Sequence, residues 1–488
     1  MKEKKLFDAI TNLPDEIIEE AAESVKKKSV FIFNRYMKIA CCFVLLIGIA
    51  VGCYVYKTGY DLHDIKTDPE NYEKIQYLVD GKVNTDDITK NNVKGALVNV
   101  SYPQSISFED SLLRKEVMQN NPVEYYFYEG LNNFAVKTGI EVLKNSQGNV
   151  NYSPMSLYYS LALLSEGAKG ETKEEILSLL GVSEEADISL QCRNFYRHIF
   201  TNNQVSKLKI ANSLWINDEI DVKEDFAENA AENFFASCYK VDFSENNTKK
   251  MMAEWIKENT CKTIDPNVQI NSEQILSILN TIYFYDEWQN RFSEESTKRD
   301  TFYLDDKKTI QCNFMNSSRL DSFTKGKGYT AASLTMKNSS RMVFILPDKN
   351  VSVKELLSDS KELEKAFLQE EDHYGKVTWK IPKFSFGSKF YLADTLKKLG
   401  ISKIFDLNAD FSNITDSDAY FDEVVQETYI SVNERGVEAS AYTDIMLVGS
   451  ALPEETAEMI LDRPFIYGII SDSNTILFMG ICENPAEQ

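Results

Sequence analysis

The sequence predicts an α+β domain that follows a single membrane-spanning helix, and three observations support this. Over residues 121–488, helix-like and strand-like patterns of apolar residues alternate irregularly and show no fixed repeat. Residues 39–56 form an apolar run without a charged side chain. The composition of the 488 residues, 43% hydrophobic and 26% charged, is typical of globular proteins and excludes a wholly disordered, collagenous or disulfide-dense chain.

The apolar run at residues 39–56 reads IACCFVLLIGIAVGCYVY. As a helix it spans about 27 Å, close to the roughly 30 Å hydrocarbon core of a bilayer. Lys38 and Lys57 flank it, where their amines reach the lipid headgroups. Basic residues crowd the end of the preceding segment, so the positive-inside rule predicts that residues 1–38 are cytoplasmic and that the chain after residue 56 is extracellular.

An uncleaved anchor is favoured over a cleaved signal peptide because 38 residues precede the apolar run, whereas a signal peptide usually has a short charged start. Cleavage with lipid attachment at Cys53 is the alternative, since the four residues ending there (AVGC) form an imperfect lipobox. The short basic head and the excess of Lys over Arg favour a bacterial, Gram-positive surface.

The net charge of −22 argues against nucleic acid as a partner, because phosphate contacts need clustered cations. Residues 1–38 carry eight bases and seven acids, a net charge of +1, so the remaining 45 bases and 68 acids place a net charge of −23 on the extracellular side. We interpret this charge as a contribution to solubility.

Residues 57–120 are polar and acidic and predict an extracellular linker, of which residues 96–110 are able to pack on the following domain. A helix is predicted over residues 124–144 from apolar residues three and four apart. A second helix is predicted after Ser153, which can cap it, with Pro154 in the first turn. Strand-like segments follow at 208–216, 276–285, 341–346, 377–384, 429–432 and 476–482.

The sequence contains no phosphate-binding loop, no metalloprotease motif, no serine-hydrolase elbow and no dinucleotide fingerprint. The three histidines, His63, His198 and His373, leave little room for a histidine-based metal site or triad. The spacing of the cysteines matches no zinc-binding motif such as C-x-x-C. We expect them to be small buried residues, and a disulfide is possible but not indicated. We therefore expect no enzyme activity, no metal and no cofactor.

Three segments resemble the serpin family in sequence and in order. The first joins residues 149–156 (NVNYSPMS) to residues 166–172 (EGAKGET). The second is residues 280–284 (NTIYF), followed by Trp288. The third is residues 433–443 (NERGVEASAYT), and the segments 462–465 and 476–480 close the chain as in the family. Because the motifs keep their order and spacing, residues 121–488 are identified as a serpin domain.

The resemblance implies a fold of three β-sheets and about nine helices, with an exposed reactive-centre loop near the C-terminus. It also implies a suicide inhibitor of serine proteases. The protease cleaves the loop and forms an acyl-enzyme, and the cut loop then inserts as a new central strand of the large sheet. The expected partner is a target protease in a covalent complex, and we expect the inhibitor itself to be a monomer.

The resemblance places the hinge of the reactive loop at Glu434, Gly436, Val437, Glu438, Ala439, Ser440, Ala441 and Thr443. An inserted central strand must alternate between the two faces of the sheet. The alternate residues Val437, Ala439, Ala441, Thr443, Ile445 and Leu447 carry no charge. The intervening set contains Glu438 and Asp444, and no proline interrupts residues 437–447. This pattern favours insertion.

The resemblance also predicts a cluster that controls sheet opening, formed by Ser153, Ser156, Asn280, Gln426 and Trp288. The family commonly has histidine where this chain has Gln426, and glutamine cannot become charged near neutral pH. We therefore do not expect gating by pH at this position. Two further departures are Val437, where Thr or Ser is usual, and the residues 285–287 (YDE) that follow Phe284.

Counting fifteen positions from Gly436 places the reactive bond at Ser450–Ala451, whereas counting back from residue 462 places it near Pro453. The count from Gly436 is favoured because the length of the segment that inserts, from Gly436 to the reactive bond, sets how far the protease is carried. We call this segment the arm of the reactive loop. Small and apolar residues around Ser450 favour elastase- or subtilisin-like proteases, while Leu452 would favour chymotrypsin-like ones. A non-inhibitory binding module and an inhibitor of cysteine proteases remain the alternatives.

Overall fold

The protein was examined as a computed structural model, which describes residues 96–98, 100–264, 266, 268–272, 274–304, 308–369, 373–421, 423–437 and 455–487. The chain divides into two units, residues 1–76 and 77–488, and all of the described residues belong to the second. The predicted membrane helix at residues 39–56 lies outside them, as do residues 438–454 of the reactive loop. No helix among the described residues is long and apolar enough to cross a membrane.

Ten α-helices and two short 3-10 helices lie in the described part of the chain, against the nine helices or so that we predicted. The α-helices are α5 (Ser111–Asn120), α6 (Tyr125–Asn145), α7 (Pro154–Gly167), α8 (Gly170–Leu180), α9 (Ile188–Ile199), α10 (Glu224–Asn233), α11 (Asn246–Asn259), α12 (Val353–Leu356), α13 (Ser360–Leu368) and α14 (Ala393–Lys398). The 3-10 helices are η2 (Glu294–Ser296) and η3 (Lys403–Phe405).

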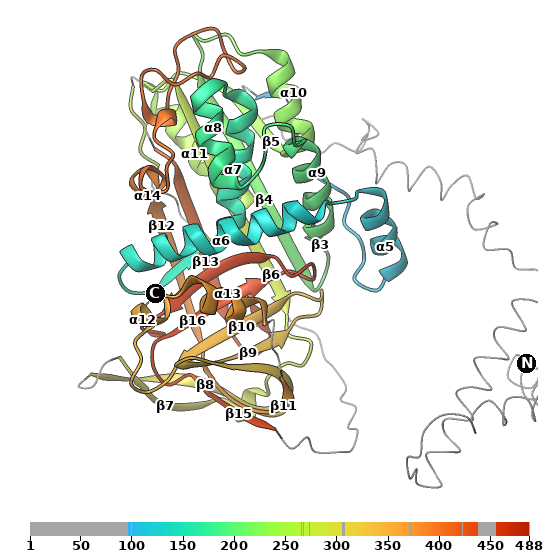
Figure 1. The fold of residues 1–488 in the computed structure, drawn as a ribbon, viewed down its shortest axis with the longest axis vertical. Helices are drawn as coiled ribbons and strands as arrows, with labels where there is room; N and C mark the ends of the chain where they lie inside the picture. Colours follow the sequence, from blue (N-terminus) through green and yellow to red (C-terminus); the bar gives the residue numbers. More distant parts are fainter. Residues whose placement is uncertain are drawn as a thin grey trace, which may run out of the picture. The chain divides into compact units, whose positions relative to one another are not determined.

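The strands form two hydrogen-bonded sheets (Figure 1). The eight-stranded sheet contains β1 (Ala96–Val98), β3 (Thr201–Asn202), β4 (Ser206–Asn217), β5 (Ala236–Val241), β6 (Leu276–Glu287), β12 (Phe384–Tyr391), β13 (Val425–Val432) and β14 (Gly436–Val437). The nine-stranded sheet contains β2 (Val150–Tyr152), β7 (Lys298–Tyr303), β8 (Thr309–Gly326), β9 (Tyr329–Thr335), β10 (Arg341–Pro347), β11 (His373–Pro382), β15 (Thr456–Ile460), β16 (Phe465–Ile470) and β17 (Ile476–Cys482).

We predicted three sheets, and the long strand β8 explains the difference. Residues 314–323 of β8 pair with β11, and residues 323–326 pair with β9. A single 18-residue strand therefore belongs to two groups of strands and joins them into one hydrogen-bonded network.

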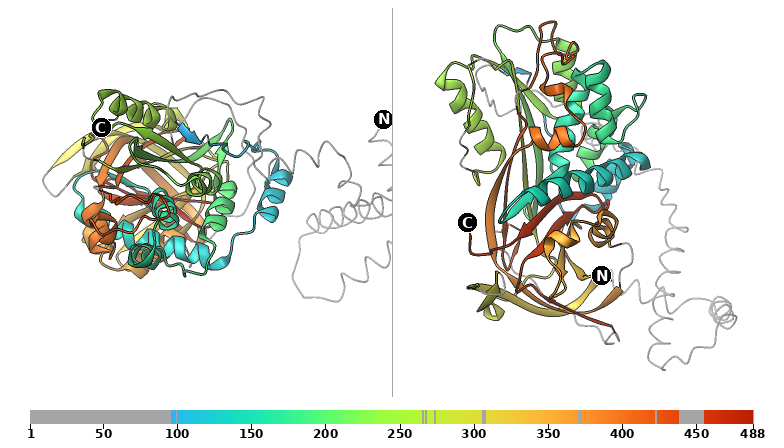
Figure 2. Two further views of the ribbon diagram at one scale, coloured as in Figure 1. Left: turned by 90° about the horizontal axis from the view of Figure 1, so that it is seen from above. Right: turned by 60° about the vertical axis from the view of Figure 1, so that its left-hand side comes forward.

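The eight-stranded sheet is covered on both faces (Figure 2). Its order is β1-β5-β4-β6-β14-β13-β12, with β3 beside β4. Neighbouring residues of β4 face opposite sides, since Leu214 belongs to the main core and Trp215 to a second core that includes Trp255 of α11. The central strands are thus buried on both sides.

Helix α7 is buried along almost its whole length and packs against β6 and β17. Its start was predicted correctly, because the Ser153 hydroxyl accepts a hydrogen bond from the Ser156 amide and Pro154 opens the first turn. The predicted helix over 124–144 is also confirmed as α6.

The end of the predicted linker packs on the domain. Strand β1 pairs with β5 at the edge of the eight-stranded sheet, and helix α5 lies beside α9 (Figure 1). The expectation that residues 96–110 are able to pack on the domain agrees with this arrangement, whereas helix α5 was not predicted.

All five cysteines of the described part are free. Cys192, Cys238 and Cys482 are buried as predicted, and Cys312 is partly buried. Cys261 is exposed, so the prediction was wrong for this residue, which follows the end of α11 at a positive φ of 50°.

Candidate functional site

Strands β6 and β13 are direct neighbours at one end and separated at the other. They pair in parallel at Val425–Leu279, Gln426–Asn280 and Glu427–Thr281. Near the C-terminal ends of the two strands, β14 lies between them and pairs antiparallel with both. The first residues after the turn at the end of β13 thus form a two-residue wedge in the centre of the sheet.

Gly436 can occupy this wedge because it has no side chain. A Cβ atom there would lie 2.2 Å from the Asp286 carbonyl oxygen and 2.7 Å from the Glu287 Cα, distances that no real Cβ adopts. The next residue, Val437, is only 2% exposed and packs in the main core. This placement agrees with the inward orientation that the alternating pattern predicts for Val437.

Trp288 fixes the turn that leads into β14. Its amide donates to the Arg435 carbonyl over 2.9 Å, and its indole nitrogen donates to the Asn433 carbonyl over 2.8 Å. The Phe292 amide donates to the Glu434 carbonyl over 2.9 Å. The segment after β6 therefore holds three successive residues of the hinge turn.

Glu434 is buried at the same turn and is bound by two side chains. Its carboxylate pairs with the Lys383 amine at 2.9 Å and accepts a hydrogen bond from the Thr297 hydroxyl at 2.8 Å. Burial alone would raise the pKa of Glu434, but the bonds from Lys383 and Thr297 outweigh it and hold the pKa below its usual value.

Glu287, at the end of β6, is held by two cations. Its carboxylate lies 2.7 Å from Arg291 and 3.1 Å from Lys337, and it accepts a third bond from the Tyr285 hydroxyl. Such a paired and hydrogen-bonded carboxylate is compatible with its burial. Glu287 therefore fixes the end of β6 beside the hinge.

At the paired end of β6 and β13, Gln426 and Ser153 form the centre of the predicted opening cluster. The Gln426 side chain accepts from the Ser153 amide and donates to the Ser153 carbonyl, both over 2.9 Å. The Ser153 hydroxyl donates to Leu477 on β17 over 2.8 Å. Glutamine thus links β13 to the start of α7 without a titratable group.

A second chain of polar groups links β6 to α7. The Asn280 amide donates to the Asn212 side chain over 2.6 Å, and the Ser160 hydroxyl lies 3.2 Å from both that oxygen and the Ser156 carbonyl. Four buried atoms here have no hydrogen-bond partner in the described part of the chain. They are Ser156 Oγ, Asn212 Nδ2, Asn280 Oδ1 and Thr281 Oγ1.

Trp288 does not join this cluster. It lies eight residues beyond Asn280 along β6, roughly 26 Å at strand spacing, and contacts the hinge turn instead. Asn212 and Ser160 were not predicted as members. An asparagine within the predicted, mostly apolar strand at 208–216 was the available signal for Asn212.

Several predicted site residues lie outside the described part of the chain. These are Glu438, Ala439, Ser440, Ala441, Thr443, Ser450 and Ala451. His198 donates to the Asn121 carbonyl, and His373 pairs with Glu455 at 2.9 Å. No group of three His, Cys, Asp or Glu residues in the described ranges is arranged to hold a metal ion.

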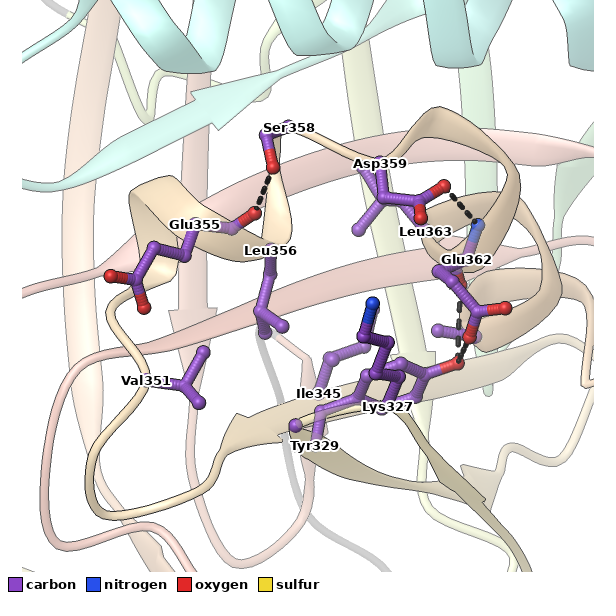
Figure 3. Close-up of a pocket in the computed structure, with 12 residues that line it drawn as sticks. Lys327, Tyr329, Ile345, Val351, Glu355, Leu356, Ser358, Asp359, Glu362 and Leu363 are labelled. Carbon is purple, nitrogen blue, oxygen red and sulfur yellow. Dashed lines mark hydrogen bonds between the residues drawn. The ribbon is translucent and has the colours of Figure 1, made fainter.

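A cavity of about 260 Å³ lies between α12, α13 and the turn before β9 (Figure 3). Two of its carboxylates bind helix starts, since Glu355 accepts from the Ser352 amide and Asp359 from the Glu362 amide. None of its lining residues belongs to the hinge or to the opening cluster. We therefore assign the cavity no part in the site.

Comparison with known proteins agrees with this geometry. Residues 129–485 match the family described as Serpin (serine protease inhibitor). The chain is 27% identical over 356 residues to alpha-1-antiproteinase of Rattus norvegicus, covering 70% of this chain and 85% of the relative. It is 26% identical over 378 residues to a serpin-like protein of Methanosarcina acetivorans, covering 74% and 89%.

Two solved structures are also similar. Serpin48 of the insect Tenebrio molitor, described as a highly specific serpin, superposes with a TM-score of 0.67 at 27% identity, covering 74% of this chain and 98% of that one. The native state of the thermophilic serpin tengpin superposes with a TM-score of 0.68 at 25% identity, covering 79% and 97%. The chain is therefore a member of the serpin family.

Proposed function

We propose that this serpin inhibits extracellular serine proteases as a suicide substrate. The observation that carries the proposal is the position of β14, because the first two residues of the reactive-loop arm already lie between β6 and β13. Residues that continued this strand would follow the line between β6 and β13 toward Asn280 and Gln426. Insertion there requires the three direct residue pairs between the strands to separate.

The arm has the composition that such an insertion needs. Each inserted residue adds ladder hydrogen bonds worth about 0.5–1.5 kcal/mol net, so about ten residues contribute on the order of 10 kcal/mol. The uncharged set that begins at Val437 continues through Ala439 and Ala441, all small enough for a packed core. A gain of this size would drive a nearly irreversible step.

In the proposed reaction, the hydroxyl oxygen of the protease serine attacks the carbonyl carbon of Ser450. The bond to the Ala451 nitrogen breaks, that nitrogen takes up a proton, and the protease remains attached as an ester. Insertion of the freed arm then carries the protease away and deforms its active site before water hydrolyses the ester.

The small residues at the proposed bond favour elastase- or subtilisin-like targets, and one experiment tests this. The full chain in detergent is mixed with elastase, subtilisin, trypsin and papain and examined on denaturing gels. We expect a complex with elastase or subtilisin that survives boiling, together with cleavage after Ser450. Cleavage without a complex across the panel would instead favour a non-inhibitory binding module, and a stable complex with papain alone would favour a cysteine-protease inhibitor.

We further propose that residues 39–56 anchor the protein in a bacterial cell membrane with the serpin domain outside. The proposal rests on the uncharged run and on the basic residues before it. Fractionation of cells that make the full chain tests it, with a variant lacking residues 39–56 as the control. Release of the full chain into the medium would contradict an anchor, and loss of membrane association in Cys53→Ser would point to lipid attachment.

A further inference from the structure

The segment before α6 is attached to the domain at several points. Strand β1 extends the sheet edge at β5, and the partly buried ring of Tyr102 stacks on Phe200 and Phe235. The amine of Lys209 lies 4.0 Å from the centre of the Tyr102 ring. Helix α5 then places the buried Val117 against α9. Residues 96–98 and 100–121 therefore form a folded part of the domain, which we call the N-terminal strap.

Arg114 connects the strap to the turn between β9 and β10. Its guanidinium donates to both the side-chain and the main-chain oxygen of Asn338, which is 224 positions away in sequence. The main-chain amide of Asn338 in turn donates to the Asp286 carboxyl group over 3.4 Å. Asp286 is the β6 residue that lies opposite Val437 of the hinge.

The same turn holds the next two positions of the chain after Asp286. The Lys337 amide donates to the Glu287 carbonyl over 2.8 Å, and Met336 forms a β-bridge with Trp288. The turn therefore touches every residue of β6 and its extension that borders the hinge. A displacement of Asn338 would therefore alter the hydrogen bonds that this end of β6 makes with the turn.

The chain from Arg114 through Asn338 ends at the carboxyl group of Asp286. The residue is fully buried, and its Oδ2 atom has no hydrogen-bond partner in the described part of the chain. Burial raises the pKa of Asp286 well above its ordinary value, while hydrogen bonds, first among them that from the Asn338 main-chain amide, act in the opposite direction and the charge of Arg114 adds least. Arg114 therefore acts on Asp286 mainly by holding Asn338, whose main-chain amide donates to this buried carboxyl group.

We propose that the N-terminal strap acts as a latch that restrains the opening of the sheet between β6 and β13. It does so by holding the C-terminal end of β6 in place through the chain Arg114–Asn338–Asp286. The latch itself rests on the contacts above. Its effect on inhibition rests on the proposed function, because only loop insertion needs the two strands to separate. Anything that detaches the strap would then lower the resistance of the sheet to opening.

Hydrogen–deuterium exchange of the full chain in detergent tests the latch without any protease. We expect Arg114→Met to raise the exchange rate of amides in residues 279–288 and 430–437 by about tenfold. The matched control is Lys115→Met, the exposed neighbour on the same helix. Asn338→Ala removes the side-chain acceptor of Arg114 but keeps the main-chain contacts, so it should produce a smaller change in β6 while α5 stays protected.

A double-mutant comparison separates the latch from a general loosening of the domain. In the Asp286→Ala background, which removes the acceptor of the Asn338 main-chain amide, Arg114→Met should raise exchange in β6 by less than about threefold, because the chain from Arg114 to β6 is already broken. Equal effects in the two backgrounds, or a change confined to α5, would overturn the proposal. Inhibition of elastase is measured separately, so a chain that does not inhibit can still confirm or refute the latch.

Discussion

The side-chain amide of Gln426 exchanges two hydrogen bonds with the backbone of Ser153, each 2.9 Å long. This pair joins β13 to the first turn of α7 at the level where β6 and β13 still pair directly. The sheet is therefore closed by a link that involves no charged group. Separation of β6 from β13 must either break these two hydrogen bonds or move Gln426 and the start of α7 together.

Gln426→Ala should lower the free energy of unfolding. The change leaves the buried Ser153 amide without its partner, at about 1–3 kcal/mol, and leaves the Ser153 carbonyl with the Leu157 amide as its donor. Urea unfolding followed by circular dichroism measures the effect, with Gln289→Ala on the surface as the control. Equal midpoints for the two variants would show that the Gln426 bonds contribute nothing net.

Gly436→Ala should expel β14 from the sheet. The new methyl group would overlap main-chain atoms of Asp286 and Glu287, which cannot move aside as a flexible side chain could. We expect a destabilisation of about 1–3 kcal/mol and faster amide exchange at residues 436–437. Gly387→Ala on β12 is the matched control, because its Cβ would meet only the Thr428 carbonyl at an ordinary 3.5 Å. Unchanged protection of residue 437 in Gly436→Ala would contradict the wedge.

Asp286→Asn should stabilise the protein, and the gain should grow as pH rises. In the folded state the raised pKa keeps the proton on Asp286 to higher pH, whereas the unfolded chain releases it near about pH 4. Folding then takes up a proton, so this residue costs stability above about pH 4 and nothing below it. We expect a gain of about 1–3 kcal/mol at pH 7. A difference between variant and parent that is the same at pH 4 and pH 7 would exclude this origin.

Glu434→Gln should have the opposite pH dependence. The lowered pKa of Glu434 means that the folded chain keeps the carboxylate charged where the unfolded chain takes up a proton. Its stabilising effect is thus present above the ordinary value of about 4.3 and is lost as pH falls through the folded pKa. Thermal unfolding should show a lower midpoint for the variant at pH 7, and the two midpoints should converge in acid. Glu458→Gln, on the exposed side of β15, is the control.

Ala439→Arg should turn the proposed inhibitor into a substrate. Residue 439 belongs to the inward set of the arm, so insertion would bury an unpaired guanidinium, which costs several kcal/mol. On denaturing gels with elastase, the trapped complex should fall by about tenfold while cleaved serpin accumulates. Ser440→Arg, in the opposite set, should retain more of the complex. If the two variants trap elastase equally, the insertion register is wrong.

The sequence alone predicted the parts of the fold that depend on local patterns. The cap at Ser153 follows from the serine and proline at the helix start, helix α6 from its helical periodicity, and the strands β4, β6, β10 and β17 from runs rich in apolar residues. The predicted strand over 377–384 instead spans the end of β11 and the start of β12, because local propensity does not show a bend between two strands.

The strands β7, β8 and β9 were not predicted, since β7 and β8 are rich in polar residues and lack a clear alternation. Strand β8 is ordered because its neighbours β7 and β9 and the more distant β11 supply its hydrogen bonds, β9 lies between β8 and β10, and β7 pairs with β8. Asn212 and Lys383 entered the site in the same way, through contacts across the sheet.

The motif near Gly436 and the order of the other family motifs were sufficient to identify the family, and they predict the hinge and the uncharged face of the reactive loop. Only the tertiary structure decided that β14 already lies in the sheet, that Trp288 serves the hinge, and that Arg114 reaches Asp286 through Asn338. The physical reason is that residue periodicity records local burial. The contacts named above join residues 52 to 224 positions apart and depend on the packing of the whole domain.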